Sequence, residues 1–89
     1  MRYAILKEID RGNKILSEKD FELEQEAFDE AVNFLSREGY LDGIFYADNR
    51  PHLFEGTVSL TEKGEIYLSE NSVLSKAYKG LKEIRSWIF

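Results

Sequence analysis

The chain has 89 residues, of which 43% are hydrophobic and 33% charged, with a net charge of −5 at pH 7 and no cysteine. These values predict one small globular domain and exclude disulfides, thiolate metal sites and cysteine nucleophiles. They fit a reducing cytoplasm, and the negative charge disfavours diffuse binding to nucleic acid. We expect neither a signal peptide nor a membrane span, because charges interrupt every apolar stretch.

The first predicted elements are two short helices separated by an apolar pair. The apolar spacing within residues 2–11 predicts a helix that ends at the Gly-Asn pair of residues 12–13. Residues 15–16 are an Ile-Leu pair that suits a short strand. Ser17 is a helix-capping residue type, so a second short helix is expected over residues 18–22.

Residues 24–38 predict a longer amphipathic helix that ends at Gly39. Its apolar side contains Phe28, Ala31, Val32 and Leu35. Its outward side contains Glu26, Asp29, Glu30, Asn33 and Arg37. A carboxylate about 5 Å from a DNA phosphate costs about 1–3 kcal/mol. The acidic first half of this helix is therefore not expected to read the major groove.

The acidic residues of this helix have two alternative interpretations. Carboxylates near a helix N-terminus are stabilised by the positive end of the helix dipole, so they fit an ordinary solvated face. Alternatively, Glu26, Asp29 and Glu30 form an interaction surface for a basic partner, or a mimic of DNA.

A β-hairpin is predicted after this helix. Residues 41–47 and 52–60 have strand-forming composition, and the "DNRP" segment at residues 48–51 between them is built from turn formers. Gly43 and Gly56 lie inside these strands, where glycine marks a bulge or a close backbone contact.

Two further helices are predicted at the C-terminal end. Thr61 is expected to cap a helix over residues 61–71, in which Gly64 costs about 1 kcal/mol relative to alanine. We expect this glycine to permit tight packing against the hairpin. Ser72 is expected to cap the last helix, which covers residues 73–88.

This order of elements predicts a single α+β domain over residues 1–89. A helix-turn-helix followed by a two-stranded wing is the winged-helix plan, here with two additional C-terminal helices. The phrases "RYAILKEI", "AVNFLSREGYLDG", "NRPH", "VSLTEKGEIYL" and "SKAYKGLKEIRSWI" give the chain a resemblance to the YjcQ-like family over nearly its whole length. The resemblance implies a small, poorly characterised, often prophage-borne protein of Gram-positive bacteria with a winged-helix-like fold. It implies no catalytic residues.

Three groups of residues are candidates for contact with double-stranded DNA. Arg50 is predicted at the hairpin tip, within reach of a phosphate or the minor groove. The end of the third helix offers Asn33, Ser36 and Arg37. The last helix offers a winding basic stripe of Lys76, Lys79, Lys82 and Arg85. A polar turn and a solvated helix face are the alternatives, and the stripe also suits the acidic helix of a second copy.

Enzyme chemistry has little support in the sequence. His52 is the single histidine, and neither a nucleophile nor a second acid is placed near it by a recognisable motif. A metal site would draw on Asp42, Asp48, His52 and Glu55, which lack a characteristic ligand spacing. We therefore expect no enzymatic activity, no metal and no cofactor.

The functional prediction is a cytoplasmic, non-enzymatic regulatory protein of the phage or prophage type that binds DNA. This prediction rests on fold analogy. The alternative is a protein-interaction module that uses no DNA. It would act through Glu26, Asp29 and Glu30, or through Trp87 and Phe89 at the aromatic C-terminus. Those aromatic residues either cover the core or form a homodimer through the C-terminal helix.

Overall fold

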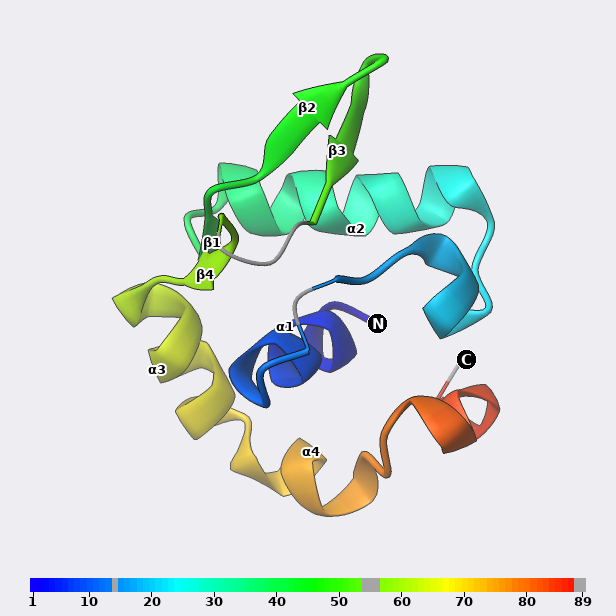
Figure 1. The fold of residues 1–89 in the computed structure, drawn as a ribbon. Helices are drawn as coiled ribbons and strands as arrows, with labels where there is room; N and C mark the ends of the chain where they lie inside the picture. Colours follow the sequence, from blue (N-terminus) through cyan, green and yellow to red (C-terminus); the bar gives the residue numbers. More distant parts are fainter. Residues whose placement is uncertain (14, 54–56, 88–89) are drawn as a thin grey trace.

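The computed structural model describes residues 1–13, 15–53 and 57–87, which form an α+β arrangement around a central helix (Figure 1). The elements in chain order are α1 (Arg2–Asp10), the 3₁₀ helix η1 (Glu18–Phe21), α2 (Gln25–Arg37), β1 (Leu41–Asp42), β2 (Phe45–Ala47), β3 (Arg50–His52), β4 (Ser59–Leu60), α3 (Glu62–Glu70), α4 (Ser72–Ala77) and the 3₁₀ helix η2 (Leu81–Trp87). No helix within these ranges is both long and apolar enough to cross a lipid bilayer.

Helix α1 forms the centre of the hydrophobic core. Its buried apolar residues are Tyr3, Ala4, Ile5, Leu6 and Ile9. A helix that is buried on most of its circumference must be covered from several sides. Accordingly, α1 contacts α2, α3 and β4. On the α2 side, the rings of Phe21 and Phe28 stack with their centroids 5.9 Å apart, which fixes η1 against α2.

Helix α2 has the amphipathic character that its sequence predicts. Phe28, Val32 and Leu35 are buried, and Ala31 packs partly against the same core. The helix ends at Arg37, and Gly39 follows with a φ of +81°. Glycine adopts this left-handed conformation without steric cost, so the predicted termination is confirmed.

The antiparallel pairing expected between residues 41–47 and 52–60 is confirmed, but it is divided into two short ladders rather than one continuous hairpin. β1 pairs with β4, and β2 pairs with β3. Gly43 separates β1 from β2 with a φ of +77°, and a Cβ atom there would lie 1.7 Å from the carbonyl oxygen of Thr57. The close backbone contact predicted at Gly43 is confirmed, and it interrupts the extended strand. Gly56 lies outside the described residues.

The turn of the β2–β3 hairpin is shorter than the sequence predicts. Asp48 and Asn49 both have positive φ, at 54° and 62°, as in a two-residue hairpin turn whose twist matches that of the strands. Arg50 and Pro51 therefore belong to β3, where they pair with Ala47 and Tyr46. This shift moves Arg50 from the hairpin tip into the strand.

The N-terminus of α3 packs closely against the backbone that precedes β1. A Cβ atom at Gly64 would lie 2.4 Å from the carbonyl oxygen of Tyr40 and 3.1 Å from the side chain of Leu60. The hydroxyl of Thr61 accepts a hydrogen bond from the Gly64 amide at 3.0 Å. Both the predicted Thr61 cap and the predicted close packing at Gly64 are confirmed.

The continuous helix expected over residues 73–88 is wrong. Helix α4 ends at Ala77, Tyr78 is extended with φ −75° and ψ 116°, and η2 begins only at Leu81. Gly80 has a φ of +103°, which reverses the chain direction where a side chain would be strained. The break turns Tyr78 into the core, where it is 3% exposed.

Replacing Gly64 with alanine is expected to destabilise the protein by about 1–2 kcal/mol. Alanine gains about 1 kcal/mol as the better helix former. The clash with the Tyr40 carbonyl costs more, because overpacking at a rigid backbone atom forces the helix away from β1. Urea unfolding measures the difference. Ser69→Ala, at an exposed position of the same helix, is the control and should change stability little. An increase in the urea midpoint of Gly64→Ala would contradict the packing argument.

Candidate functional site: the outer face of helix α2

The β2–β3 hairpin is tied to α2 by an arginine–aspartate pair. The Nε of Arg50 donates to Oδ2 of Asp29 at 2.8 Å, and its Nη2 donates to Oδ1 at 3.0 Å. The same Nη2 lies 3.4 Å from Oε2 of Glu18 on η1. The hydrogen bond that Arg50 donates to Asp29 is the main cause that raises the pKa of Arg50 above its usual range. Two carboxylates thus compensate the charge of the hairpin arginine.

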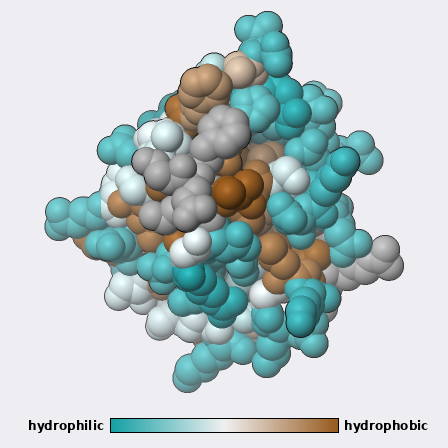
Figure 2. All heavy atoms as spheres, viewed as in Figure 1, coloured by the Kyte–Doolittle hydropathy of each residue, from teal (hydrophilic) through white to brown (hydrophobic). Residues whose placement is uncertain are grey.

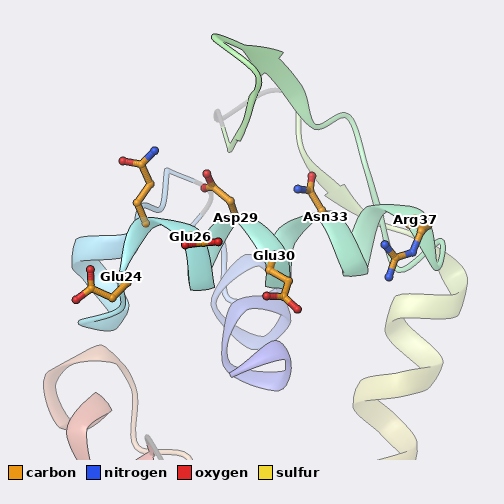
Figure 3. Close-up of a pocket in the computed structure, with 7 residues that line it drawn as sticks. Glu24, Glu26, Asp29, Glu30, Asn33 and Arg37 are labelled. Carbon is orange, nitrogen blue, oxygen red and sulfur yellow. The ribbon is translucent and has the colours of Figure 1, made fainter.

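A second contact joins the same two elements. The hydroxyl of Tyr46 on β2 donates to Oδ1 of Asn33 at 3.2 Å. Asp29 and Asn33, which the sequence places on the outward side of α2, therefore point towards the hairpin and are partly buried (Figure 3). Glu26, Glu30 and Arg37 remain exposed.

The outer face of α2 is a shallow, mostly acidic groove. It is lined by Glu24, Gln25, Glu26, Asp29, Glu30, Asn33 and Arg37 (Figure 3). The carboxylates occupy the N-terminal part, and Arg37 stands at the other end. Among the residues that the structure describes, no group of three His, Cys, Asp or Glu side chains is arranged to hold a metal ion. The groove therefore offers a negative field rather than a coordination site.

Strand β2 adds exposed aromatic side chains beside this groove. Phe45 is 51% exposed and Tyr46 is 54% exposed. Figure 2 shows hydrophobic atoms on the surface where Figure 1 places this strand. Successive residues of a strand point to opposite faces, so Tyr46 faces α2 and Phe45 faces away from it.

The predicted basic stripe does not run along a single helix, because its residues belong to different elements. Lys76 lies on α4, Lys79 in the connection after it, and Lys82 on η2, and all three are exposed. Arg85 and Trp87 belong to η2, but their side chains lie outside the described part, as does Phe89. Ser36 is partly buried on α2. The residues predicted to contact DNA thus come from α2, β3, α4, η2 and the connection after α4, and their contact with DNA remains a prediction.

His52 lies in β3, opposite Phe45 in the ladder, and is partly buried. Asp48, one of the acids considered as its partner, lies in the exposed hairpin turn, while Glu55 is outside the described residues. Absence of enzymatic activity remains a prediction.

A buried polar cluster that the sequence analysis missed joins α1 to the C-terminal segment. Glu8 is 6% exposed, and its Oε2 accepts a hydrogen bond from the Tyr78 hydroxyl at 2.6 Å. Asn13 donates to the other oxygen at 3.3 Å, and Arg11 lies 3.6 Å from Oε2. Burial, followed by the hydrogen bond to Glu8, raises the pKa of Tyr78. The sequence held one sign of this cluster, because Glu8 lies on the apolar side of α1 next to Ile9, where a carboxylate needs a hydrogen-bond partner.

Comparison with known proteins identifies the family. The family described as "YjcQ protein" matches residues 3–87. The chain belongs to the YjcQ family. It is 59% identical over 88 residues to "Uncharacterized protein YjcQ" of Bacillus subtilis (strain 168), covering 99% of this chain and 94% of the relative. The solution NMR structure of the Bacillus subtilis YjcQ protein has a TM-score of 0.73, covering 80% of this chain and 91% of that one. The descriptions of these relatives name no activity, so a function has to be argued from the surface.

Replacing Tyr78 with phenylalanine is expected to lower the free energy of unfolding by about 1–3 kcal/mol at neutral pH. The substitution preserves the ring but removes a donor from the buried Glu8 carboxylate. Urea unfolding measures the loss. Tyr46→Phe is the comparison variant, because it removes an exposed hydrogen bond to Asn33 rather than a buried one, and it should cost less.

The same pair predicts a loss of stability in alkali. The pKa of Tyr78 is raised in the folded protein above its unfolded value of about 10. Its contribution is therefore complete below about pH 10 and is lost as the pH rises through the folded-state pKa. Unfolding of the wild type should depend more steeply on pH above about pH 10 than unfolding of Tyr78→Phe. Equal slopes would mean that burial and the hydrogen bond to Glu8 do not raise the pKa of Tyr78 in the folded protein.

Proposed function

We propose that the protein is a non-enzymatic cytoplasmic regulator that binds a basic segment of another protein along the acidic face of α2. The observation that carries this proposal is the pairing of Arg50 with Asp29 and Glu18. The pairing compensates the positive charge of the hairpin, while Glu26 and Glu30 stay exposed. The surface beside the hairpin therefore favours a cationic partner over a polyanion.

The interaction energies of the exposed carboxylates on α2 also favour a cationic partner over DNA. At about 5 Å, each exposed carboxylate of α2 repels a phosphate by about 1–3 kcal/mol. An exposed ion pair between the same carboxylate and a lysine or arginine contributes about 0.2–1 kcal/mol net. The hydroxyl of Tyr46 donates to Asn33, which lines the same groove, and the ring is exposed enough to contact a cation, which contributes about 0.5–1 kcal/mol at such sites. Complementary charge also accelerates encounter with a basic partner.

Duplex DNA is the second candidate partner, and the order of elements favours it. We infer that α1, η1 and α2 correspond to a helix-turn-helix and that β2–β3 corresponds to a wing, which would make the domain a winged helix. In that topology α2 occupies the place of the recognition helix. The hydrogen bonds from Arg50 to Asp29 and from Tyr46 to Asn33 count against this candidate, because they direct polar groups of the wing and helix towards each other.

Binding of a fluorescein-labelled oligolysine peptide tests the leading proposal. We expect Glu26→Gln combined with Glu30→Gln to weaken the complex about tenfold, because two exposed ion pairs of ~0.7 kcal/mol each are lost. Fluorescence anisotropy at low and high salt measures the affinity. Glu62→Gln combined with Glu70→Gln removes the same charge from exposed positions of α3 and is the control. If the two double variants weaken the complex equally, the peptide responds only to the net charge of the protein, and the proposal is overturned.

Binding of a mixed-sequence DNA duplex tests the second candidate. If the hairpin arginine contacts phosphate, Asp29→Asn should strengthen duplex binding, since it releases Arg50 and removes one negative charge. Glu62→Gln makes the same change of charge on α3. A gain for Asp29→Asn of about fivefold or more over this control would favour the wing as a DNA contact. Equal affinities would argue against DNA reading through Arg50.

A further inference from the structure

Arg2 is held in place by an aromatic ring rather than by a carboxylate. Its guanidinium carbon lies 3.5 Å from the ring centroid of Phe34, and that of Arg37 lies 5.7 Å from the same centroid. A ring attracts a cation through its quadrupole and carries no net charge. Phe34 therefore orders the Arg2 guanidinium without cancelling its charge.

The stacked geometry leaves the donors of Arg2 available. Stacking uses the flat face of a guanidinium, whereas its N–H groups lie in the plane and point outward. Within the described residues, no carboxylate lies at ion-pair distance from Arg2. Arg37 is 3.9 Å from Glu38, but both side chains are largely exposed, so that pair is weak. Arg2 thus presents a fixed and uncompensated cation on an acidic protein.

A groove between four helices opens beside this arginine. Its walls come from α1, α2, α3 and α4, and it encloses about 490 Å³. Tyr3, Ala27, Ala31, Tyr67 and Leu74 line it, with Arg2 at its edge. Volumes of this order suit a small molecule with an apolar body. Ala27 and Ala31 are one helical turn apart, so they line the same side of the groove with small side chains, and Tyr67 of α3 also lines it.

The groove carries opposite charges at two positions, a cation at Arg2 and a carboxylate at Glu30. Glu30 also lines it and repels an anion at its own position. An acid group is therefore favoured at Arg2 and disfavoured at Glu30, which orients an elongated ligand. Glu30 lines both this groove and the acidic face of α2, but the other residues of the two surfaces differ. The inference therefore goes beyond the proposed function and does not depend on it.

We propose that the groove binds a small aromatic anion. The flat body packs against Tyr67 and the small side chains of Ala27 and Ala31, where it buries apolar surface. The acid group accepts hydrogen bonds from the in-plane N–H groups of Arg2. A carboxylate, sulfonate or phosphate monoester satisfies this geometry.

Two related probes test the proposal. Anilinonaphthalene sulfonate carries an aromatic body and an anionic group, and phenylnaphthylamine has the same rings without the anion. Fluorescence titration of the folded protein should show binding of the sulfonate that Arg2→Gln weakens about tenfold, as expected for a lost charge-assisted hydrogen bond. Binding of the neutral amine should be weaker and insensitive to Arg2→Gln. Lys19→Gln, at an exposed position of η1, is the charge-matched control.

A groove-filling variant keeps the test independent of Arg2. Ala27 is exposed, so Ala27→Leu keeps the core intact and fills part of the groove, and both probes should lose binding. Amide shifts in an NMR titration should gather on Arg2, Ala31, Tyr67 and Leu74. The proposal is overturned if Arg2→Gln and Lys19→Gln bind the sulfonate equally, if Ala27→Leu binds as the wild type does, or if the shifts gather elsewhere.

Discussion

The burial of α1 is the constraint on which the rest of the structure depends. A chain of 89 residues supports only one small core, and α1 supplies its centre. Helices α2 and α3 and strand β4 cover this helix directly. The C-terminal segment does so by breaking after Ala77, which carries the Tyr78 hydroxyl to Glu8. A carboxylate buried on α1 requires such a donor, because an unsatisfied buried charge is costly. The hydrogen bond between Tyr78 and Glu8 therefore fixes where the segment after α4 lies against α1.

Much of the fold was predictable because its causes are local. The spacing of Phe28, Val32 and Leu35 marks α2, and glycine at position 39 marks its end. Gly64 was informative because a helix glycine has a cost, and the close approach of the Tyr40 carbonyl explains that cost. These inferences need only the preferences of residues for backbone conformations and for burial. Those preferences act over one or two helical turns.

The features that sequence reasoning missed depend on contacts between distant residues. The helical spacing of Leu74, Tyr78 and Leu81 continues through the break, so periodicity gave no warning of it. The break follows from a contact between Tyr78 and Glu8, 70 positions apart. The pairing of Arg50 with Asp29 spans 21 positions and requires the hairpin to lie across α2. Neither local composition nor charge counts determine how a hairpin lies on a helix.

The way each arginine is held decides which surfaces remain available for binding. The positive charge of Arg50 is compensated by Asp29 and Glu18. This pairing holds the hairpin on α2 and leaves the hairpin arginine without an available charge. Arg2 stacks on Phe34, which fixes its position and leaves its charge intact. Two arginines of the same formal charge thus have opposite consequences for recognition. The hairpin side of α2 becomes an acidic surface suited to cations, and the groove on the Arg2 side becomes suited to an anion. Net charge alone would have assigned both surfaces the same preference.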